Sequence, residues 1–405
     1  MQNNNLAING GEPVRKVPMP FREAFGPSEE KALFDAVNYY RRNNVDPPYE
    51  GIFEKQFCDE FIKYMGDGYA DAVASGTAAC YIAVAALNLP TGSDVLISPV
   101  TDSGPLNGII MLGLKPVLMD SAPGSYNIGV DQFLERITTD TSAVFVVHSA
   151  GEPVDIETIT QEAHKRGIKV IEDCSQAPGS VCAGQKVGTF GDVAAFSTMY
   201  RKTLTAGASG GIVYSTDLDI YHHALAYADR GRPKWRADYN SGNPGDALFP
   251  SLNFNTDDLS CAIGLASLGR LQETIDKRCS FLEKLCECLF GESKVCRPYN
   301  FHSGISPFYF PIFVDSEKIT CGKLEFAKAL QAEGIALSPQ YDCVISSWDY
   351  AKKFMKDDFV ARNAEDVRDC SFNLFLNEKY GARELKDIMK AILKVENYFQ
   401  MKAEK

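Results

Sequence analysis

Short apolar runs and amphipathic stretches alternate along the first half of the chain. The runs are rich in valine and isoleucine and cover residues 71–75, 94–98, 115–120, 143–147 and 169–173. Each run is followed by a turn and then by apolar residues at helical spacing. Continuously apolar strands are typical of parallel sheets that helices cover on both faces. The pattern therefore predicts an α/β fold with parallel strands and crossover helices.

The second half of the chain changes character after the predicted sheet is complete. Two apolar runs, 191–199 and 210–216, are expected to close that sheet. Residues 261–290 keep helical spacing throughout, which predicts one long helix leading into a second domain. In that domain we expect a strand over 306–314 and helices over 323–334 and 382–399.

These elements divide the chain into three predicted parts. The first residues look like an extended arm, and the predicted sheet belongs to a larger domain than the one that follows it. The predicted bounds are 1–25 for the arm, 26–265 for the large domain and 266–405 for a small α+β domain.

Composition and charge narrow the class of protein. Of the 405 residues, 45% are hydrophobic and 23% are charged, which is ordinary for a soluble globular protein. The formal net charge of -12 repels polyanions, so we do not expect nucleic acid as a partner. One local basic cluster stands out, either as a solvated loop or as a loop that contacts an anionic substrate. Its members are Arg230, Arg232, Lys234 and Arg236.

The cysteines and the first residues bear on the compartment. The twelve cysteines are scattered, and the one close pair, Cys286 and Cys288, lacks the spacing of a zinc knuckle, so we predict no metal site. The sequence begins without a basic and then apolar leader, and no apolar run reaches about 18 residues. We expect a reduced, cytoplasmic protein that does not enter a membrane.

Polar residues follow several of the predicted strands, at the edge where ligands bind in open α/β sheets. Ser75, Gly76 and Thr77 end one strand just before a helix, where backbone N–H groups and the helix dipole favour a phosphate. A serine or threonine that caps the helix would explain the same residues without a ligand.

Asp173 ends another strand, and Gln176 follows it by one turn. The carboxylate could pair with a protonated ring nitrogen and the amide could bond a ring substituent, but an ordinary turn residue would also fit. Lys202 lies beyond a further strand, with Ser197 in reach of a phosphate. A lysine near an apolar or cationic site becomes a nucleophile for carbonyls. Taken alone, Lys202 is better explained as a surface lysine beside Arg201, and Asn253 as a cap or turn residue before a helix.

The order of these segments resembles the fold-type I pyridoxal phosphate (PLP) enzymes, and more narrowly the DegT/DnrJ/EryC1/StrS family of sugar aminotransferases. The resemblance covers most of the chain. The segments that carry it include "ASGTAA", "VVHSAGEPVDI", "VIEDCSQAPGS" and "LNFNTDDLSCAIGLASL". It implies a three-layer αβα fold like that of aspartate aminotransferase, with a mostly parallel sheet in a PLP-binding large domain.

The resemblance also implies a role for each candidate residue. Lys202 matches the lysine that forms a Schiff base with PLP, Asp173 the partner of the pyridine nitrogen, and Gln176 the glutamine near the ring hydroxyl. The expected phosphate contacts are Gly76, Thr77, Ser197 and, from the neighbouring subunit of a homodimer, Asn253.

The chain departs from the family pattern at three positions. Ser103 stands where an aromatic residue usually stacks on the pyridine ring, Pro178 replaces a histidine, and Asn255 replaces an arginine. The retained lysine argues against the sugar 3-dehydratase branch, in which a histidine takes its place.

By resemblance, the expected activity is transfer of an amino group to a keto sugar, often nucleotide-linked, or to a keto-cyclitol, with glutamate as the expected donor. The basic loop is a candidate contact for an acceptor phosphate, and Tyr341 for the lining of the pocket. Two alternatives remain open: a PLP-dependent dehydratase or aromatising synthase on the same scaffold, and a non-catalytic PLP-binding regulator.

Overall fold

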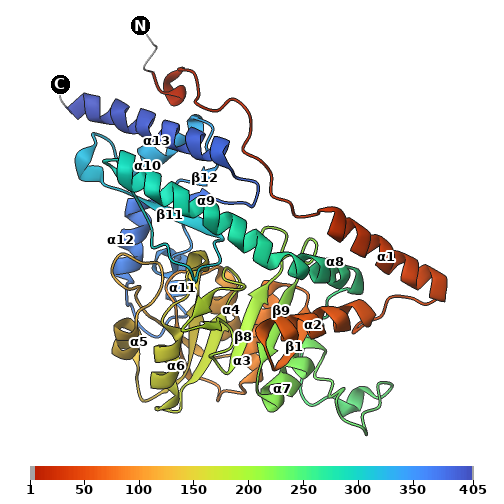
Figure 1. The fold of residues 1–405 in the computed structure, drawn as a ribbon. Helices are drawn as coiled ribbons and strands as arrows, with labels where there is room; N and C mark the ends of the chain where they lie inside the picture. The colour runs from red at the N-terminus through yellow and green to blue at the C-terminus, as the bar shows by residue number, and fades with distance from the viewer. Residues whose placement is uncertain (1–4, 404–405) are drawn as a thin grey trace.

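The computed structural model describes residues 5–403, and its centre is a seven-stranded sheet (Figure 1). The strand order is β1-β9-β8-β5-β4-β2-β3. β9 runs antiparallel to both of its neighbours and the other pairs are parallel, which confirms the predicted mostly parallel sheet. The strands are β1 (Tyr69–Val73), β2 (Asp94–Ile97), β3 (Lys115–Leu118), β4 (Thr141–Val147), β5 (Lys169–Asp173), β8 (Val193–Ser197) and β9 (Gly211–Ser215).

Helices cover both faces of this sheet. Side chains alternate along a strand, so Val95 and Ile97 pack with α3 and α4 on one face, whereas Leu96 packs with α5 and α6 on the other. α2 and α8 cover the remainder of that second face. The predicted three-layer αβα arrangement is therefore confirmed. The helices are α1 (Pro27–Asn43), α2 (Ile52–Met65), α3 (Gly76–Ala86), α4 (Ser103–Met111), α5 (Val130–Arg136), α6 (Ile156–His164), α7 (Leu218–Ala228) and α8 (Asp258–Gly269).

A second, four-stranded antiparallel sheet has the order β10-β11-β13-β12. The predicted strand over 306–314 and the two predicted helices are present as β11, α10 and α13. The elements are α9 (Leu271–Glu292), β10 (Cys296–Pro298), β11 (Tyr309–Val314), α10 (Lys323–Ala332), β12 (Leu337–Ser338), α11 (Asp349–Lys352), α12 (Arg362–Cys370), β13 (Ser371–Phe375) and α13 (Ala382–Ala403).

Short elements complete the fold. They are the two-stranded sheet of β6 (Val181–Cys182) and β7 (Gln185–Lys186), and the 3₁₀ helices at Ala7–Asn9, Ser149–Gly151, Pro244–Asp246, Ser316–Lys318 and Ile345–Ser347. Residues of α11 and α12, such as Ala351 and Val367, pack into the apolar cluster of the seven-stranded sheet. These contacts cross the predicted boundary between the large and the small domain. The division at residue 265 therefore stays a prediction. Within residues 5–403, no helix has the combination of length and apolarity that crossing a membrane requires.

The single helix predicted over 261–290 is wrong in one respect, because the chain breaks between α8 and α9 at Arg270 (φ -112°, ψ 7°). Leu268 packs against the seven-stranded sheet, whereas Phe281 onward packs against the four-stranded sheet. The guanidinium of Arg270 binds the carboxylate of Glu29 and the carbonyl of Glu23 in the arm. Apolar spacing continues across the break, so the sequence pattern carries no sign of it.

The described part of the predicted arm, residues 5–25, contains only a short 3₁₀ helix and packs beside α10 and α13 (Figure 1). Leu6 is fully buried in the apolar cluster of the four-stranded sheet. Glu333 accepts hydrogen bonds from the backbone N–H groups of Ala7 and Val14, both at 2.9 Å. Arg15 pairs with Glu384 and Asp387 of α13 at 3.1 and 2.7 Å. The arm is therefore part of the packed structure.

Candidate active site

Lys202 lies on the loop after β8, between the two sheets. Its Nζ is 4.4 Å from the centroid of the Phe308 ring, just before β11. The side chain is half-buried, and burial lowers the pKa of the Lys202 amine, while the charges of Asp173 and Asp102 oppose that shift. A lowered pKa increases the neutral fraction of the amine, which is the form that attacks carbonyls and accepts protons.

Asp173 ends β5, the strand next to β8, so the sheet itself brings it near Lys202. The residue is buried, and its Oδ1 accepts a hydrogen bond from the Ser175 N–H at 2.9 Å. Burial raises the pKa of the Asp173 carboxyl, against the opposing effects of the Ser175 hydrogen bonds and of the Lys202 charge. A cationic group placed beside this carboxylate would offset the cost of burying its charge.

Gln176 is fixed at both ends of its amide. Its Oε1 accepts a hydrogen bond from the Ala150 N–H at 2.8 Å, and its Nε2 donates to the Tyr341 hydroxyl at 3.3 Å. The Tyr341 ring lies 5.0 Å from that of Tyr309, between ring centroids. The structure thus places Tyr341, from the loop after β12, beside the residue predicted to face the cofactor ring.

The N-terminus of α3 has the features of a phosphate site. Ser75 caps the helix: its Oγ accepts from the Ala78 N–H at 3.1 Å. Across residues 5–403, no group accepts a hydrogen bond from the N–H of Gly76 or of Thr77, so both are available to a ligand. A Cβ on Gly76 would lie 2.5 Å from the Cβ of Ser197, so a glycine is required where Ser197 approaches. The predicted phosphate contacts Gly76, Thr77 and Ser197 therefore come together.

Asn253 lies on the segment beside the end of β1, where the Phe254 carbonyl accepts a hydrogen bond from the Ala74 N–H at 2.8 Å and Asn255 forms a bridge to Val73. Asn253 is exposed, and its Nδ2 donates to the Tyr49 hydroxyl at 3.2 Å. Its Oδ1 accepts from the Asn255 N–H at 3.1 Å and from the Asn255 amide at 2.7 Å. The prediction that Asn253 reaches the phosphate of a neighbouring subunit stays a prediction.

The three departures from the family pattern each have a local structural setting. Ser103 begins α4, and Asp102 caps that helix by accepting from the Gly104 N–H at 3.1 Å. The Pro178 carbonyl accepts a hydrogen bond from Ser306 Oγ at 2.7 Å. An aromatic ring is thus absent from position 103, and the nearest ring to the Lys202 amine that the structure shows is Phe308.

Sequence reasoning missed a buried pair behind Asp173. His148 and Glu172 are fully buried, with Nε2 and Oε2 3.2 Å apart. The Glu172 carboxylate also accepts backbone N–H bonds from Gly188, Phe190 and Gly191. Their ligand atoms lie within 4.8 Å of that of Cys174, but these existing hydrogen bonds explain the group as a structural one. Both residues lie in segments that carry the family resemblance, His148 in "VVHSAG" and Glu172 in "VIEDC", so the sequence did contain them as candidates.

The basic loop is partly neutralised by its own aspartate. Asp229 is buried and pairs with Arg230 at 2.6 Å, with Lys234 at 2.7 Å and with Arg232 at 3.5 Å. Lys234 also pairs with Glu50. These contacts fold three of the four cations back onto the protein, so the loop offers less free positive charge than its sequence indicates.

The cluster fits PLP. The free N–H groups of Gly76 and Thr77 suit its phosphate, the buried Asp173 suits its pyridine nitrogen, and the Lys202 amine suits its aldehyde. These three groups come from the ends of different strands of one sheet, which is the expected position of a ligand in an α/β fold.

Comparisons with known proteins agree with this geometry. The chain is 32% identical over 229 residues to the GDP-perosamine synthase of Escherichia coli O157:H7, covering 56% of this chain and 61% of that protein. It is 32% identical over 214 residues to the L-glutamine:2-deoxy-scyllo-inosose aminotransferase of Streptoalloteichus tenebrarius, covering 52% of this chain and 50% of that protein. The matches thus span half to three-fifths of these relatives.

A solved structure and a family model cover more of the chain. The aminotransferase from Psychrobacter cryohalolentis superposes with a TM-score of 0.86 at 21% identity, over 94% of this chain and all of that one, which shows a shared fold. The model of the DegT/DnrJ/EryC1/StrS aminotransferase family matches residues 33–393. The chain therefore belongs to the DegT/DnrJ/EryC1/StrS aminotransferase family.

Proposed function

We propose that the protein is a PLP-dependent aminotransferase that moves an amino group from an amino acid, with glutamate as the expected donor, to a keto sugar or keto-cyclitol. The observation that carries the proposal is the Lys202 amine, which lies 4.4 Å from the centroid of the Phe308 ring and follows the strand next to that of the buried Asp173. Burial lowers the pKa of this amine. The names of the two relatives, a perosamine synthase and an inosose aminotransferase, support this class of acceptor.

Each residue of the candidate site has a separate role in the proposed reaction. When bound, PLP supplies an aldehyde that condenses with amines and a ring that accepts electrons. Lys202 Nζ, as a neutral amine, takes a proton from the α-carbon of the donor and returns one to the acceptor carbon. Asp173 holds a proton at the ring nitrogen, because a buried carboxylate is stabilised by a cation beside it. Gly76, Thr77 and Ser197 bind the phosphate and fix the distance from Lys202 to the ring.

Product analysis tests the proposal. With purified protein, PLP, glutamate and a panel of keto sugars and keto-cyclitols, we expect one mole of 2-oxoglutarate for each mole of amino product. Loss of water from the acceptor without 2-oxoglutarate would instead identify a dehydratase or aromatising synthase. A visible band that no amino donor changes would identify a non-catalytic regulator.

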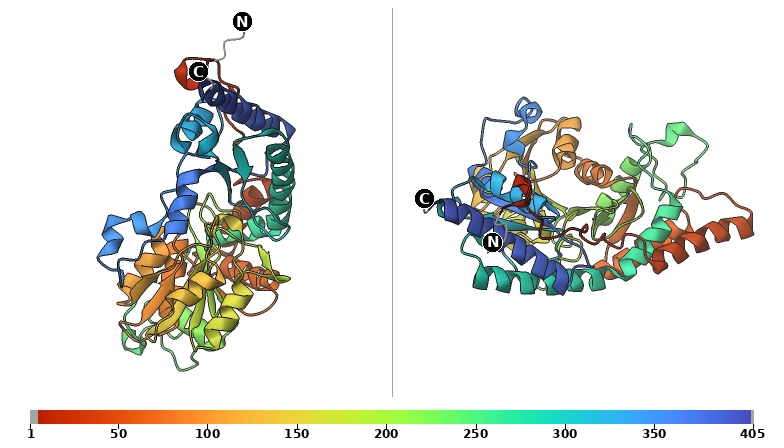
Figure 2. Two further views of the ribbon diagram at one scale, coloured as in Figure 1. Left: turned by 90° about the vertical axis from the view of Figure 1, so that its left-hand side faces the viewer. Right: turned by 90° about the horizontal axis from the view of Figure 1, so that it is seen from above.

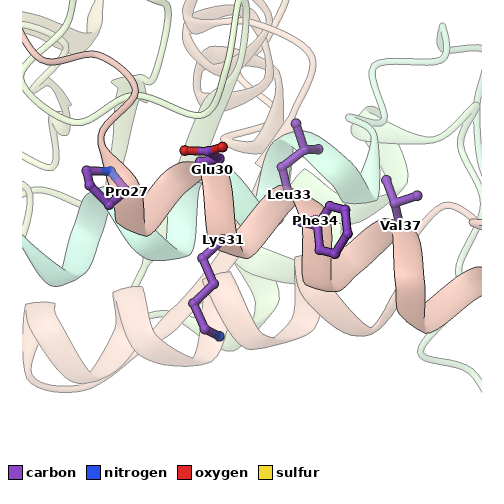
Figure 3. A pocket seen from close by; sticks show the side chains of 6 residues that line it. All are labelled: Pro27, Glu30, Lys31, Leu33, Phe34 and Val37. Carbon is purple, nitrogen blue, oxygen red and sulfur yellow. The ribbon is translucent and has the colours of Figure 1, made fainter.

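A homodimer is part of the proposal, and α1 supplies its support. This helix extends away from the body of the molecule (Figures 1 and 2). Its outer side carries apolar side chains over a shallow pocket (Figure 3), among them Phe34, which is 68% exposed. Phe21 and Phe25, just before α1, are also largely exposed. The pocket is also lined by Glu30 and Lys31. Exposed apolar side chains gathered in one region favour an interface, and we infer that a second copy of the chain covers them.

Charge reversal on α1 tests the interface. We expect Phe34→Glu to shift the protein from dimer to monomer in sedimentation, because a carboxylate would then lie in the buried contact. Phe290→Glu is the matched control, since Phe290 is 75% exposed on α9, away from α1. Equal masses for both variants and the unmodified protein would rule out α1 as the interface. Since Asn253 is predicted to serve the partner, the monomer should also bind PLP less tightly.

A cytoplasmic location belongs to the same proposal. Buried cysteines such as Cys80 and Cys174 are free thiols in the structure. Free thiols of this kind are typical of reducing compartments.

A further inference from the structure

Arg22 of the N-terminal arm reaches the backbone that carries Lys202. Its Nη1 donates hydrogen bonds to the carbonyl of Lys202 and, at 3.0 Å, to that of Tyr200. The arm therefore touches the loop of the reactive lysine directly, although the two segments are far apart in the sequence. Hydrogen bonds from a charged donor are stronger than neutral ones.

A second arginine holds the next residue of the same loop. Arg278 of α9 is almost fully buried and donates to Thr203 Oγ1 at 3.1 Å and to the Pro307 carbonyl at 2.9 Å. Pro307 precedes Phe308, the ring beside the Lys202 amine. Arg278 also pairs with Glu378 at 3.0 Å, and Glu378 accepts from the Glu23 N–H at 2.7 Å.

The position of Arg22 is not explained by charge pairing. Its Nε and Nη2 are buried, and no described residue accepts a hydrogen bond from either. Burial lowers the pKa of Arg22 to about 10, and the nearby charge of Arg278 adds to that shift. Buried donors without partners cost stability. The hydrogen bonds that Arg22 does make go to the carbonyls of residues 200 and 202. The charges of Glu378 and Glu29 also favour the charged guanidinium, although neither carboxylate forms an ion pair with Arg22.

We propose that Arg22 is a positioning residue for Lys202: it fixes the peptide of the lysine and thereby keeps the amine beside the Phe308 ring. The inference rests on the proposed function in one respect, since it takes Lys202 as the reactive lysine. Arg22 touches the backbone and not the reacting atoms. Its loss therefore changes the placement of the amine and not the chemistry available to it.

The same arm offers a matched control. Arg15 is buried and pairs with Glu384 and Asp387, with no contact to the Lys202 loop. Arg15→Met removes a buried arginine from the arm and leaves two carboxylates short of a partner, so it should lower the melting temperature at least as much as Arg22→Met. A general loosening of the arm should therefore appear in both Arg22→Met and Arg15→Met. An effect on Lys202 should appear in Arg22→Met alone.

The first measurement uses the protein without PLP. The Lys202 N–H donates to the Met199 carbonyl at 2.8 Å, so its hydrogen exchange reports on the loop. We expect exchange in the peptide covering 198–206 to rise about tenfold in Arg22→Met and to stay unchanged in Arg15→Met. The pH dependence of Lys202 labelling by an amine reagent should shift in Arg22→Met and not in Arg15→Met. Equal exchange and equal labelling in the two variants would overturn the proposal.

Kinetics and a conservative variant complete the test. A displacement of a reacting group by about 1 Å costs roughly 10²-fold in rate, so kcat should fall by about 10- to 100-fold in Arg22→Met, with little change in KM. Arg22→Lys should restore part of the exchange protection and of kcat, because an ammonium can donate to the same carbonyls. If Arg22→Met does not fold, the comparison of Arg22→Lys with Arg15→Lys decides. If the unmodified protein is inactive with every acceptor, the proposed function fails. The hydrogen-exchange comparison still tests whether Arg22 fixes the backbone of Lys202, because it needs no activity.

Discussion

Replacing Lys202 with alanine is expected to lower kcat by about 10⁴-fold, because the side chain serves both as the nucleophile for the cofactor and as the proton carrier. Burial lowers the pKa of the amine, which increases the neutral fraction that both roles require. Borohydride reduction of the PLP-loaded protein, followed by peptide mapping, should place the label on Lys202 in the unmodified protein. The variant should carry none.

The control for this substitution is the neighbouring residue. Arg201 is exposed, and its guanidinium lies over the Tyr200 ring at 5.4 Å. Arg201→Ala removes a cation from the same loop and should keep both the label and kcat. A label on a different lysine, or turnover that survives in Lys202→Ala, would remove the basis of the proposed function.

Replacing Asp173 with asparagine should lower kcat by about 10²- to 10³-fold, because the variant keeps the shape of the side chain and loses the charge that holds a proton on the cofactor ring. The PLP-loaded variant should also show a visible spectrum that differs from that of the unmodified protein at the same pH. Asp155→Asn is a suitable control. Asp155 caps α6 from an exposed position, and asparagine caps helices equally well.

Asp173→Asn is expected to lower kcat, but to raise the stability of the protein without PLP. Burial raises the pKa of Asp173, so the folded state holds its proton more tightly than the unfolded state does. The contribution of this group to stability is complete below the pKa of the unfolded chain, about 4, and is lost as the pH rises through the higher folded pKa. Asp173→Asn should therefore melt at a higher temperature than the unmodified protein at neutral pH, without PLP. A lower melting temperature would contradict the assignment of a buried, unpaired carboxylate.

The strands and most helices could be predicted because burial leaves a simple record in the sequence. β2 and β4 are buried on both faces, and the candidate site residues lie at or after the ends of β1, β5 and β8. Asp173 and Lys202 stood out only when the order of all these segments was compared with a known family. The candidate phosphate site shows in the sequence as a cap and a glycine before α3.

Contacts between distant segments could not be predicted. At the break, Arg270 contacts Glu29 of α1 and Glu23 of the arm, and nothing in the apolar spacing of residues 261–290 marks it. The approach of Arg22 to Lys202, of Phe308 to the amine and of Tyr341 to Gln176 joins different parts of the chain. The pairing of Arg230 and Lys234 with Asp229 could not be predicted, because a sequence shows which residues are charged but not where their side chains point.

The packing of the arm has a consequence for the order of synthesis. Ala7 and Arg15 leave the ribosome early, but the residues that bind them, Glu333 just after α10 and Asp387 of α13, are made much later. The arm must therefore wait, unpacked, until almost the whole chain has emerged, and domains otherwise fold as units during translation. Docking of the arm thus belongs among the final events of maturation, so a chain truncated near its C-terminus would leave the first residues with nowhere to pack.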